Sequence, residues 1–118
     1  TNEAGDRAVR PRAYAGHVQK VMARVRKVAP EPDCLVLGPT DRADTVARTP
    51  LVRDALRDGA ARAGCAFFDT YEQMGGKGSI DTWRRETPPR AAPDGIHLTW
   101  RGYHEMGDKL AAAALAGY

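Results

Sequence analysis

The sequence lacks several features that would place a protein in a broad class at once. No apolar run approaches the roughly 20 residues needed to cross a bilayer, so we expect no membrane span. The first residues have neither the basic nor the apolar region of a signal peptide, and there is no initiating methionine. We therefore expect a processed or excised piece of a longer chain, whose start does not identify the compartment.

Cysteine and aromatic residues are also scarce. The two cysteines are too few for a disulfide scaffold and lack the spacing of metal ligands, so we expect neither a metal nor a cofactor. Aromatic residues make up 7%, and the 18 basic residues are mixed with 15 acidic ones to a net charge of +3. Because a nucleic-acid interface combines a focused basic stripe with aromatic side chains, we expect no nucleic-acid partner.

What is present fits part of a globular α/β domain. The hydrophobic share of 42% and the charged share of 28% are ordinary for such a protein, and 118 residues hold at most one domain. Apolar spacing predicts helices over 11–29, 50–63 and 99–117, and short apolar runs predict strands over 34–37 and 65–69. The stretch 74–93, rich in glycine and proline, is expected to be irregular.

The order of these elements indicates an incomplete parallel sheet. Helices that alternate with strands buried on both faces are typical of parallel α/β sheets. Two such strands do not make a stable sheet alone, because each needs neighbours and cover. We therefore expect residues 1–118 to be the C-terminal portion of a single larger domain that needs its N-terminal part.

Cys34 and Cys65 occupy equivalent positions at the start of the two predicted strands. If these strands are neighbours in a parallel sheet, the two Cα atoms fall within disulfide range, which would favour an exported protein. Two buried free thiols are the alternative, and from the sequence alone we prefer them.

The densest chemical signal is Asp94-Gly95-Ile96-His97, in a predicted loop that leads into the last helix. An imidazole titrates near neutral pH and takes a proton from a hydroxyl, while a carboxylate on its other nitrogen fixes the tautomer. The same residues also fit a turn with a partly buried histidine. On spacing alone, this structural interpretation is the better supported of the two.

Asp94 to Thr99, followed by Gly102-Tyr103, resembles the C-terminal block of the SGNH (GDSL-type) serine hydrolase family. The resemblance implies the C-terminal part of a three-layer α/β/α sandwich with a parallel sheet, which is a flavodoxin-like fold. It also implies a Ser-His-Asp triad in which His97 is the general base and Asp94 is its partner.

Two further segments resemble the same family. Thr1-Asn2-Glu3 is similar to the block whose asparagine donates to the oxyanion, which implies that role for Asn2. Leu35 to Asp41 is similar, more loosely, to a strand and Gly-Pro turn found in these proteins. The three matches occur in the family's order and span most of the chain.

The family's Gly-Asp-Ser block and its oxyanion glycine are missing from this sequence. Ser79 is the only serine; it lies next to several glycines and follows no strand-to-helix elbow, so we interpret it as part of a loop. We expect the nucleophile to lie upstream and the chain alone to be inactive.

The resemblance implies an ester hydrolase of the carboxylesterase or carbohydrate/peptidoglycan O-acetylesterase type, with a small-molecule or carbohydrate ester as substrate. A non-catalytic binding module on the same fold and an acyltransferase with the same triad are the alternatives. Trp83 and Trp100 are candidates to line an acyl or sugar pocket, although ordinary packing is slightly preferred for both, and of the two we keep Trp100 as the candidate for substrate contact. Tyr103 is expected to pack in the core. The compartment is left open, with a periplasmic or secreted bacterial location favoured.

Overall fold

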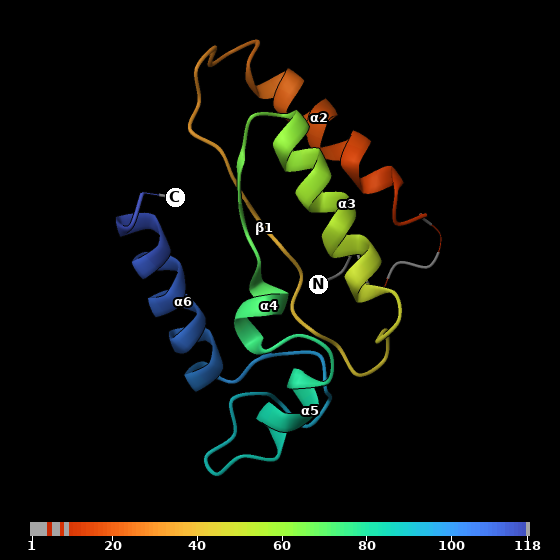
Figure 1. The fold of residues 1–118 in the computed structure, drawn as a ribbon, viewed down its shortest axis with the longest axis vertical. Helices are drawn as coiled ribbons and strands as arrows, with labels where there is room; N and C mark the ends of the chain where they lie inside the picture. Colours follow the sequence, from red (N-terminus) through yellow and green to blue (C-terminus); the bar gives the residue numbers. More distant parts are fainter. Residues whose placement is uncertain (1–4, 6–7, 9, 118) are drawn as a thin grey trace.

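The computed structural model describes residues 5, 8 and 10–117 (Figure 1). Its helices and strands are α2 (Ala13–Val25), β1 (Leu35–Leu37), α3 (Thr49–Arg62), β2 (Ala66–Phe68), α4 (Thr70–Met74), α5 (Ser79–Arg84) and α6 (Trp100–Leu115). This order confirms the predicted alternation of helices and strands, to which α4 and α5 are additions. Over the same residues, no helix has both the length and the apolar character that a membrane crossing requires.

β1 and β2 pair as parallel strands, with Leu35 opposite Ala66 and Leu37 opposite Phe68. Adjacent parallel strands require a crossover connection, which α3 supplies. α3 contacts both strands. The mixed α/β class and the parallel pairing are therefore as the sequence indicates.

The face of β1 that carries Leu35 and Leu37, here called the open face, is exposed to solvent. Side chains alternate between the two faces along a strand, so Leu35 and Leu37 point to the same side, away from that of Val36. Their exposed fractions are 43% and 54%. The prediction of strands buried on both faces is therefore wrong for β1, because the described helices leave these two leucines largely exposed.

α2 packs along α3 through small residues. A Cβ atom on Gly59 of α3 would approach the Cα and carbonyl oxygen of Ala15 of α2 to 2.8 Å, so this contact requires glycine. The buried cluster beside it consists of Tyr14, Val52 and Ala55. α2 is shorter than the predicted 11–29 because the apolar stripe loses its cover: Val28 is 87% exposed.

Cys34 and Cys65, each directly before its strand, form a disulfide with their Cα atoms 4.7 Å apart. The free thiols that we preferred from the sequence are therefore wrong. The parallel register brings the starts of β1 and β2 side by side, and the Ala66 N–H donates to the Cys34 carbonyl oxygen at 2.9 Å.

The C-terminal half has a second core, built around α5. Its buried members are Met74, Ile80, Trp83, Ala91, Leu98 and Met106. The prediction of an irregular chain over 74–93 is wrong for the α5 residues, because six residues offer too few positions for a helical period to be visible. Trp83 packs in the core as expected, with 2% of its surface exposed.

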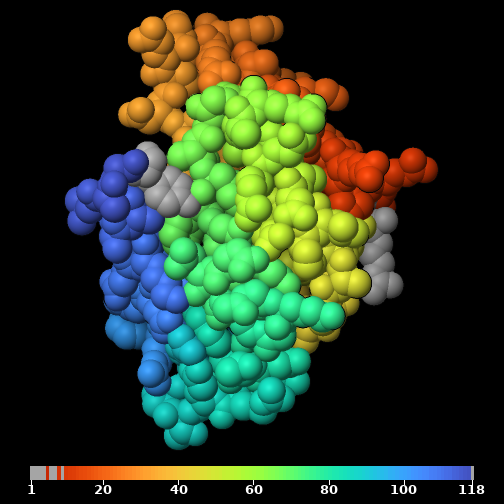
Figure 2. All heavy atoms as spheres, viewed as in Figure 1, coloured from red at the N-terminus to blue at the C-terminus, as the bar shows by residue number. Residues whose placement is uncertain are grey.

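α6 begins where the sequence predicts. Thr99 caps it, since the Gly102 N–H donates to the Thr99 Oγ1 at 3.3 Å. Tyr103 is 58% exposed, so its predicted place in the core is wrong. It lines a shallow apolar hollow between α6 and the sheet, together with Leu37 and Phe68. Figure 2 shows α6 along one side of the molecule, next to the packed surface of α4 and α5.

Candidate active site

The turn over 94–97 is held by the side chain of Asp94. Its Oδ1 accepts hydrogen bonds from the backbone N–H groups of Ile96 at 2.8 Å and His97 at 3.0 Å. Gly95 has a φ of 67°, in the left-handed region that favours glycine. A Cβ atom there would also lie 2.8 Å from that of Ala43. The turn therefore requires both the aspartate and the glycine.

The other carboxylate oxygen of Asp94 pairs with the imidazole ring, with Oδ2 2.7 Å from Nδ1 of His97. An ionised carboxylate only accepts hydrogen bonds, so Nδ1 carries the hydrogen and donates it. In the neutral ring this leaves Nε2 as the nitrogen that accepts a proton. The side chains of His97 and Asp94 are 66% and 46% exposed, so the ring is accessible to a hydroxyl group from outside the chain.

The pKa of Asp94 is lowered to about 2, first by the hydrogen bond from the His97 ring and then by the backbone N–H groups of His97 and Ile96. A positive charge lies near it as well. The pKa of Arg42 is raised, mainly by its hydrogen bond to Asp44, and Asp94 is among the smaller causes. Asp94 is therefore ionised at neutral pH, as required of a partner that stabilises a protonated imidazole.

Two separate backbone segments hold the turn in place. Residues 88–92, here called the strap, lie against one side, where the Ala92 N–H donates to the His97 carbonyl oxygen at 2.8 Å. On the other side the Ala43 N–H donates to the Gly95 carbonyl oxygen at 2.9 Å. These bonds restrict the main chain on both sides of the imidazole, which favours one orientation of the ring.

The loop that carries Ala43 is fixed in turn by Asp41. This carboxylate is fully buried, and its Oδ2 accepts a hydrogen bond from the Ile80 N–H at 3.1 Å. The segment after β1 is thereby tied to the start of α5. Over the described residues, no group of three or more His, Cys, Asp or Glu side chains is arranged to hold a metal ion.

No family model matches the chain, and no curated protein matches it either. The chain is similar to a solved structure described as "Peptidoglycan O-acetylesterase in action, 5 min", with a TM-score of 0.86 and 21% sequence identity. The match covers 98% of this chain and 35% of the other, so this chain spans about a third of that structure's length. The likeness shows the fold.

The other predicted residues are placed as follows. Asn2 lies outside the described residues. Ser79 is buried at the start of α5, and among the described residues its Oγ has no hydrogen-bond partner, so it lacks the histidine contact of an activated nucleophile. Trp100 is 77% exposed, and its ring centroid lies 3.8 Å from that of His104.

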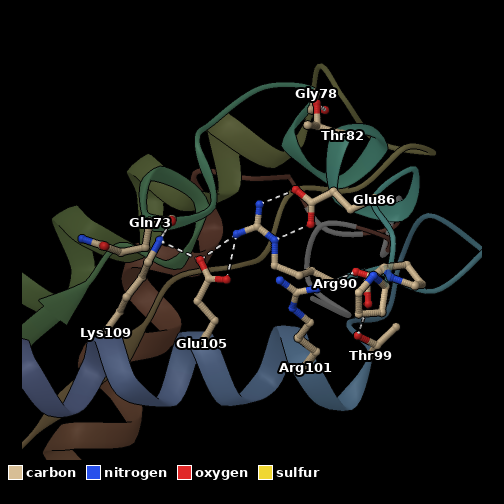
Figure 3. A network of polar contacts seen from close by, with 11 residues as sticks. Gln73, Gly78, Thr82, Glu86, Arg90, Thr99, Arg101, Glu105 and Lys109 are labelled. Carbon is tan, nitrogen blue, oxygen red and sulfur yellow. Dashed lines mark hydrogen bonds and ion pairs between the residues drawn. The ribbon is translucent and has the colours of Figure 1, made fainter.

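The sequence analysis missed Arg90, whose side chain holds the strap (Figure 3). Its Nε bonds Glu86 at 2.6 Å, and its Nη1 bonds both carboxylate oxygens of Glu105 in α6 at 2.7 and 2.8 Å. The four-residue spacing from Glu86 is a signal that the sequence contains. Glu105 is fifteen residues away, and only the fold brings it to Arg90.

Proposed function

We propose that this chain is part of an ester hydrolase with a Ser-His-Asp triad, to which it contributes His97 and Asp94. The observation that carries the proposal is the 2.7 Å contact between the two side chains, on an accessible turn held from both sides. The similarity in fold to a structure described as a peptidoglycan O-acetylesterase supports it. In this proposal the serine lies upstream of residue 1.

Each residue then has a defined role in the reaction. Nε2 of His97 takes the proton of the serine hydroxyl as the bond between Oγ and the ester carbon forms. Asp94 stabilises the resulting imidazolium, and the Asn2 side chain donates to the oxyanion. The bond to the alcohol then breaks, and His97 returns the proton to that alcohol. A water molecule, activated in the same way, releases the acyl group from the serine.

For the substrate we propose a short acyl ester on a carbohydrate, of the O-acetyl type. The turn is exposed, which leaves the reacting group open to a large, polar alcohol. Trp100 lies three residues after His97 and presents an exposed indole ring beside His104. Flat aromatic faces suit the apolar faces of sugar rings, so we assign Trp100 to substrate contact.

The rest of the domain would complete the sheet in this proposal and give the three-layer α/β/α sandwich. Two apolar hollows of about 390 and 490 Å³ lie next to β1, one lined by residues of α2 and one by residues of α6. The exposed Leu35 and Leu37 line them. Upstream strands with their helices fit this surface, because parallel strands are covered on both faces.

The test uses the full natural protein with p-nitrophenyl acetate and O-acetylated peptidoglycan as substrates. His97→Ala should lower kcat/KM on the order of 10⁴-fold or more, because it removes the general base of the triad. His17→Ala is the matched control: His17 is also an exposed histidine, on α2, and its loss should leave the activity unchanged.

Near-normal ester cleavage in the His97→Ala variant would contradict the proposal. Labelling of the natural protein by a fluorophosphonate probe should identify the serine; no labelling at all would favour a non-catalytic binding module. Transfer of the acetyl group to an added alcohol in preference to water would favour an acyltransferase.

A further inference from the structure

The strap is the direct neighbour of the His97 main chain, and Arg90 lies at its centre. The Arg90 N–H donates to the Trp83 carbonyl oxygen at 3.0 Å, and the Arg90 carbonyl oxygen accepts the Thr99 N–H at 3.0 Å. One residue therefore joins α5 to the start of α6. Two positions further on, Ala92 holds the His97 carbonyl oxygen.

The side chain of Arg90 is bound by two carboxylates, which Figure 3 shows, and by one aromatic ring. It makes a two-point contact with Glu86, which follows α5, and another with Glu105 of α6. Its guanidinium carbon lies 4.1 Å from the centroid of the Trp83 ring, within the range of a cation–π contact. The pKa of Arg90 is raised, first by the hydrogen bond to Glu86, so the charge that holds both carboxylates is permanent.

This arrangement requires the geometry of arginine. A planar guanidinium offers five donors in a fixed fork, whereas the ammonium of lysine is a point charge that does not bind two carboxylates in this way. The side chain of Arg90 is 21% exposed, and those of Glu86 and Glu105 are 29% and 31% exposed, so water screens these contacts only in part.

The strap and α6 are in close contact, so a side chain that holds one of them also restricts the position of the other. A Cβ atom on Gly102 would lie 2.1 Å from the Arg90 carbonyl oxygen, so the first turn of α6 rests directly on the strap. Glu105 lies one turn further along the same helix. The Arg90 side chain thus fixes the distance between α6 and the strap. These two segments flank the His97 turn in the sequence, so their separation limits how the turn can move.

We propose that Arg90 is a positioning residue for the catalytic histidine: by clamping the strap to α6, it holds the His97 ring in register with Asp94. This inference rests on the proposed function, because it concerns the same histidine. Arg90 itself touches no reacting group. Its loss should change how His97 is oriented while His97 and Asp94 are both still present.

The test is NMR on the full natural protein labelled with ¹⁵N-histidine, comparing the wild type with Arg90→Met. In the wild type the neutral His97 ring should be a single Nδ1–H tautomer. In Arg90→Met the ring should exchange between both tautomers, and the pKa of Asp94 should rise from about 2 towards its ordinary value. In the full natural protein kcat should fall roughly tenfold to a hundredfold with little change in KM.

Arg53→Met is the matched control. Arg53 is also a partly buried arginine that pairs with two carboxylates, Asp54 and Glu72, and its guanidinium lies 5.1 Å from the Tyr71 ring. This variant loses a comparable network away from the strap. It should lower the melting temperature but keep the single His97 tautomer and the Asp94 titration.

A His97 ring that keeps its tautomer in folded Arg90→Met would overturn the positioning role and leave the proposed function intact. A wild-type ring with mixed tautomers would instead count against the Asp94–His97 pair itself. If Arg90→Met does not fold, Glu105→Gln gives the same comparison, because it removes one charged arm while keeping the side chain's size. Arg90→Lys should restore the single tautomer only in part.

Discussion

At the scale of single residues, the ionisation of Asp94 is the most direct property to measure. Its folded pKa of about 2 lies below the ordinary value near 3.9, so folding favours the charged form. The stability that this shift contributes is present above the unfolded pKa and is lost as the pH falls towards 2. The ¹³C carboxyl resonance of Asp94 should therefore titrate with a midpoint near 2.

The cause of this shift is testable in the same experiment. The largest cause is the hydrogen bond from the His97 ring, so His97→Ala should raise the midpoint towards the ordinary value. His17→Ala should leave the midpoint where it is. A wild-type midpoint near 4 would show that the carboxylate and the ring are not paired in solution.

Which residues could be predicted from the sequence depends on how local their interactions are. Asp94 and His97 are three residues apart with a glycine between them, so their pairing in a turn is visible in the sequence. The pairing of Arg90 with Glu105 depends on how α5 and α6 pack, which no local pattern records. Tyr103 was placed in the core because a helical period shows which residues share a face, not whether that face is covered.

At the scale of elements, the contact between α6 and the strap predicts that replacing two glycines of α6 by alanine has opposite effects on the free energy of unfolding. A Cβ atom on Gly102 would lie 2.1 Å from a backbone oxygen, whereas one on Gly107 would meet nothing within 4 Å. Gly102→Ala should lower the free energy of unfolding by about 1–3 kcal/mol or more, because α6 must move off the strap.

Gly107→Ala should instead raise the free energy of unfolding by roughly 0.5–1 kcal/mol, because alanine favours the helix and no neighbour has to move. Urea unfolding followed by circular dichroism measures both variants. Equal effects of the two substitutions would contradict the close approach at Gly102.

The helices that were predicted correctly are those with enough residues to show a period. α3 and α6 have 14 and 16 residues and were placed nearly to their ends. α5 has six residues, and the glycines before it indicated a loop. Its helical form is fixed by burial of Ile80 and Trp83 in the second core, which is a tertiary effect.

At the scale of the whole molecule, α3 contacts both strands of the sheet, while Leu35 and Leu37 of β1 are exposed. The parallel order followed from the alternation of helices and strands, because such strands need a crossover. Free thiols were preferred to the Cys34–Cys65 disulfide, and wrongly, because the sequence pattern does not say which strands are neighbours. The open face of β1 is the feature that connects the fold to the proposal of a larger domain.

The open face predicts that one substitution has two different effects. Leu37 is 54% exposed in this chain, so Leu37→Asn should change the free energy of unfolding of the 118-residue chain by less than about 1 kcal/mol. If upstream strands cover this face, the same leucine is buried in the full natural protein. The substitution should then lower the free energy of unfolding of the full protein by roughly 2–4 kcal/mol, because it removes a buried apolar side chain and buries an amide.

Leu115→Asn is the matched control, since Leu115 is 90% exposed near the end of α6 and away from the sheet. It should leave the free energy of unfolding unchanged in both the 118-residue chain and the full natural protein. Urea unfolding of the four variant proteins measures the difference between the forms. A cost at Leu37 that is the same in the short chain and in the full protein would mean that this face stays open, and the rest of the domain would then have to join elsewhere.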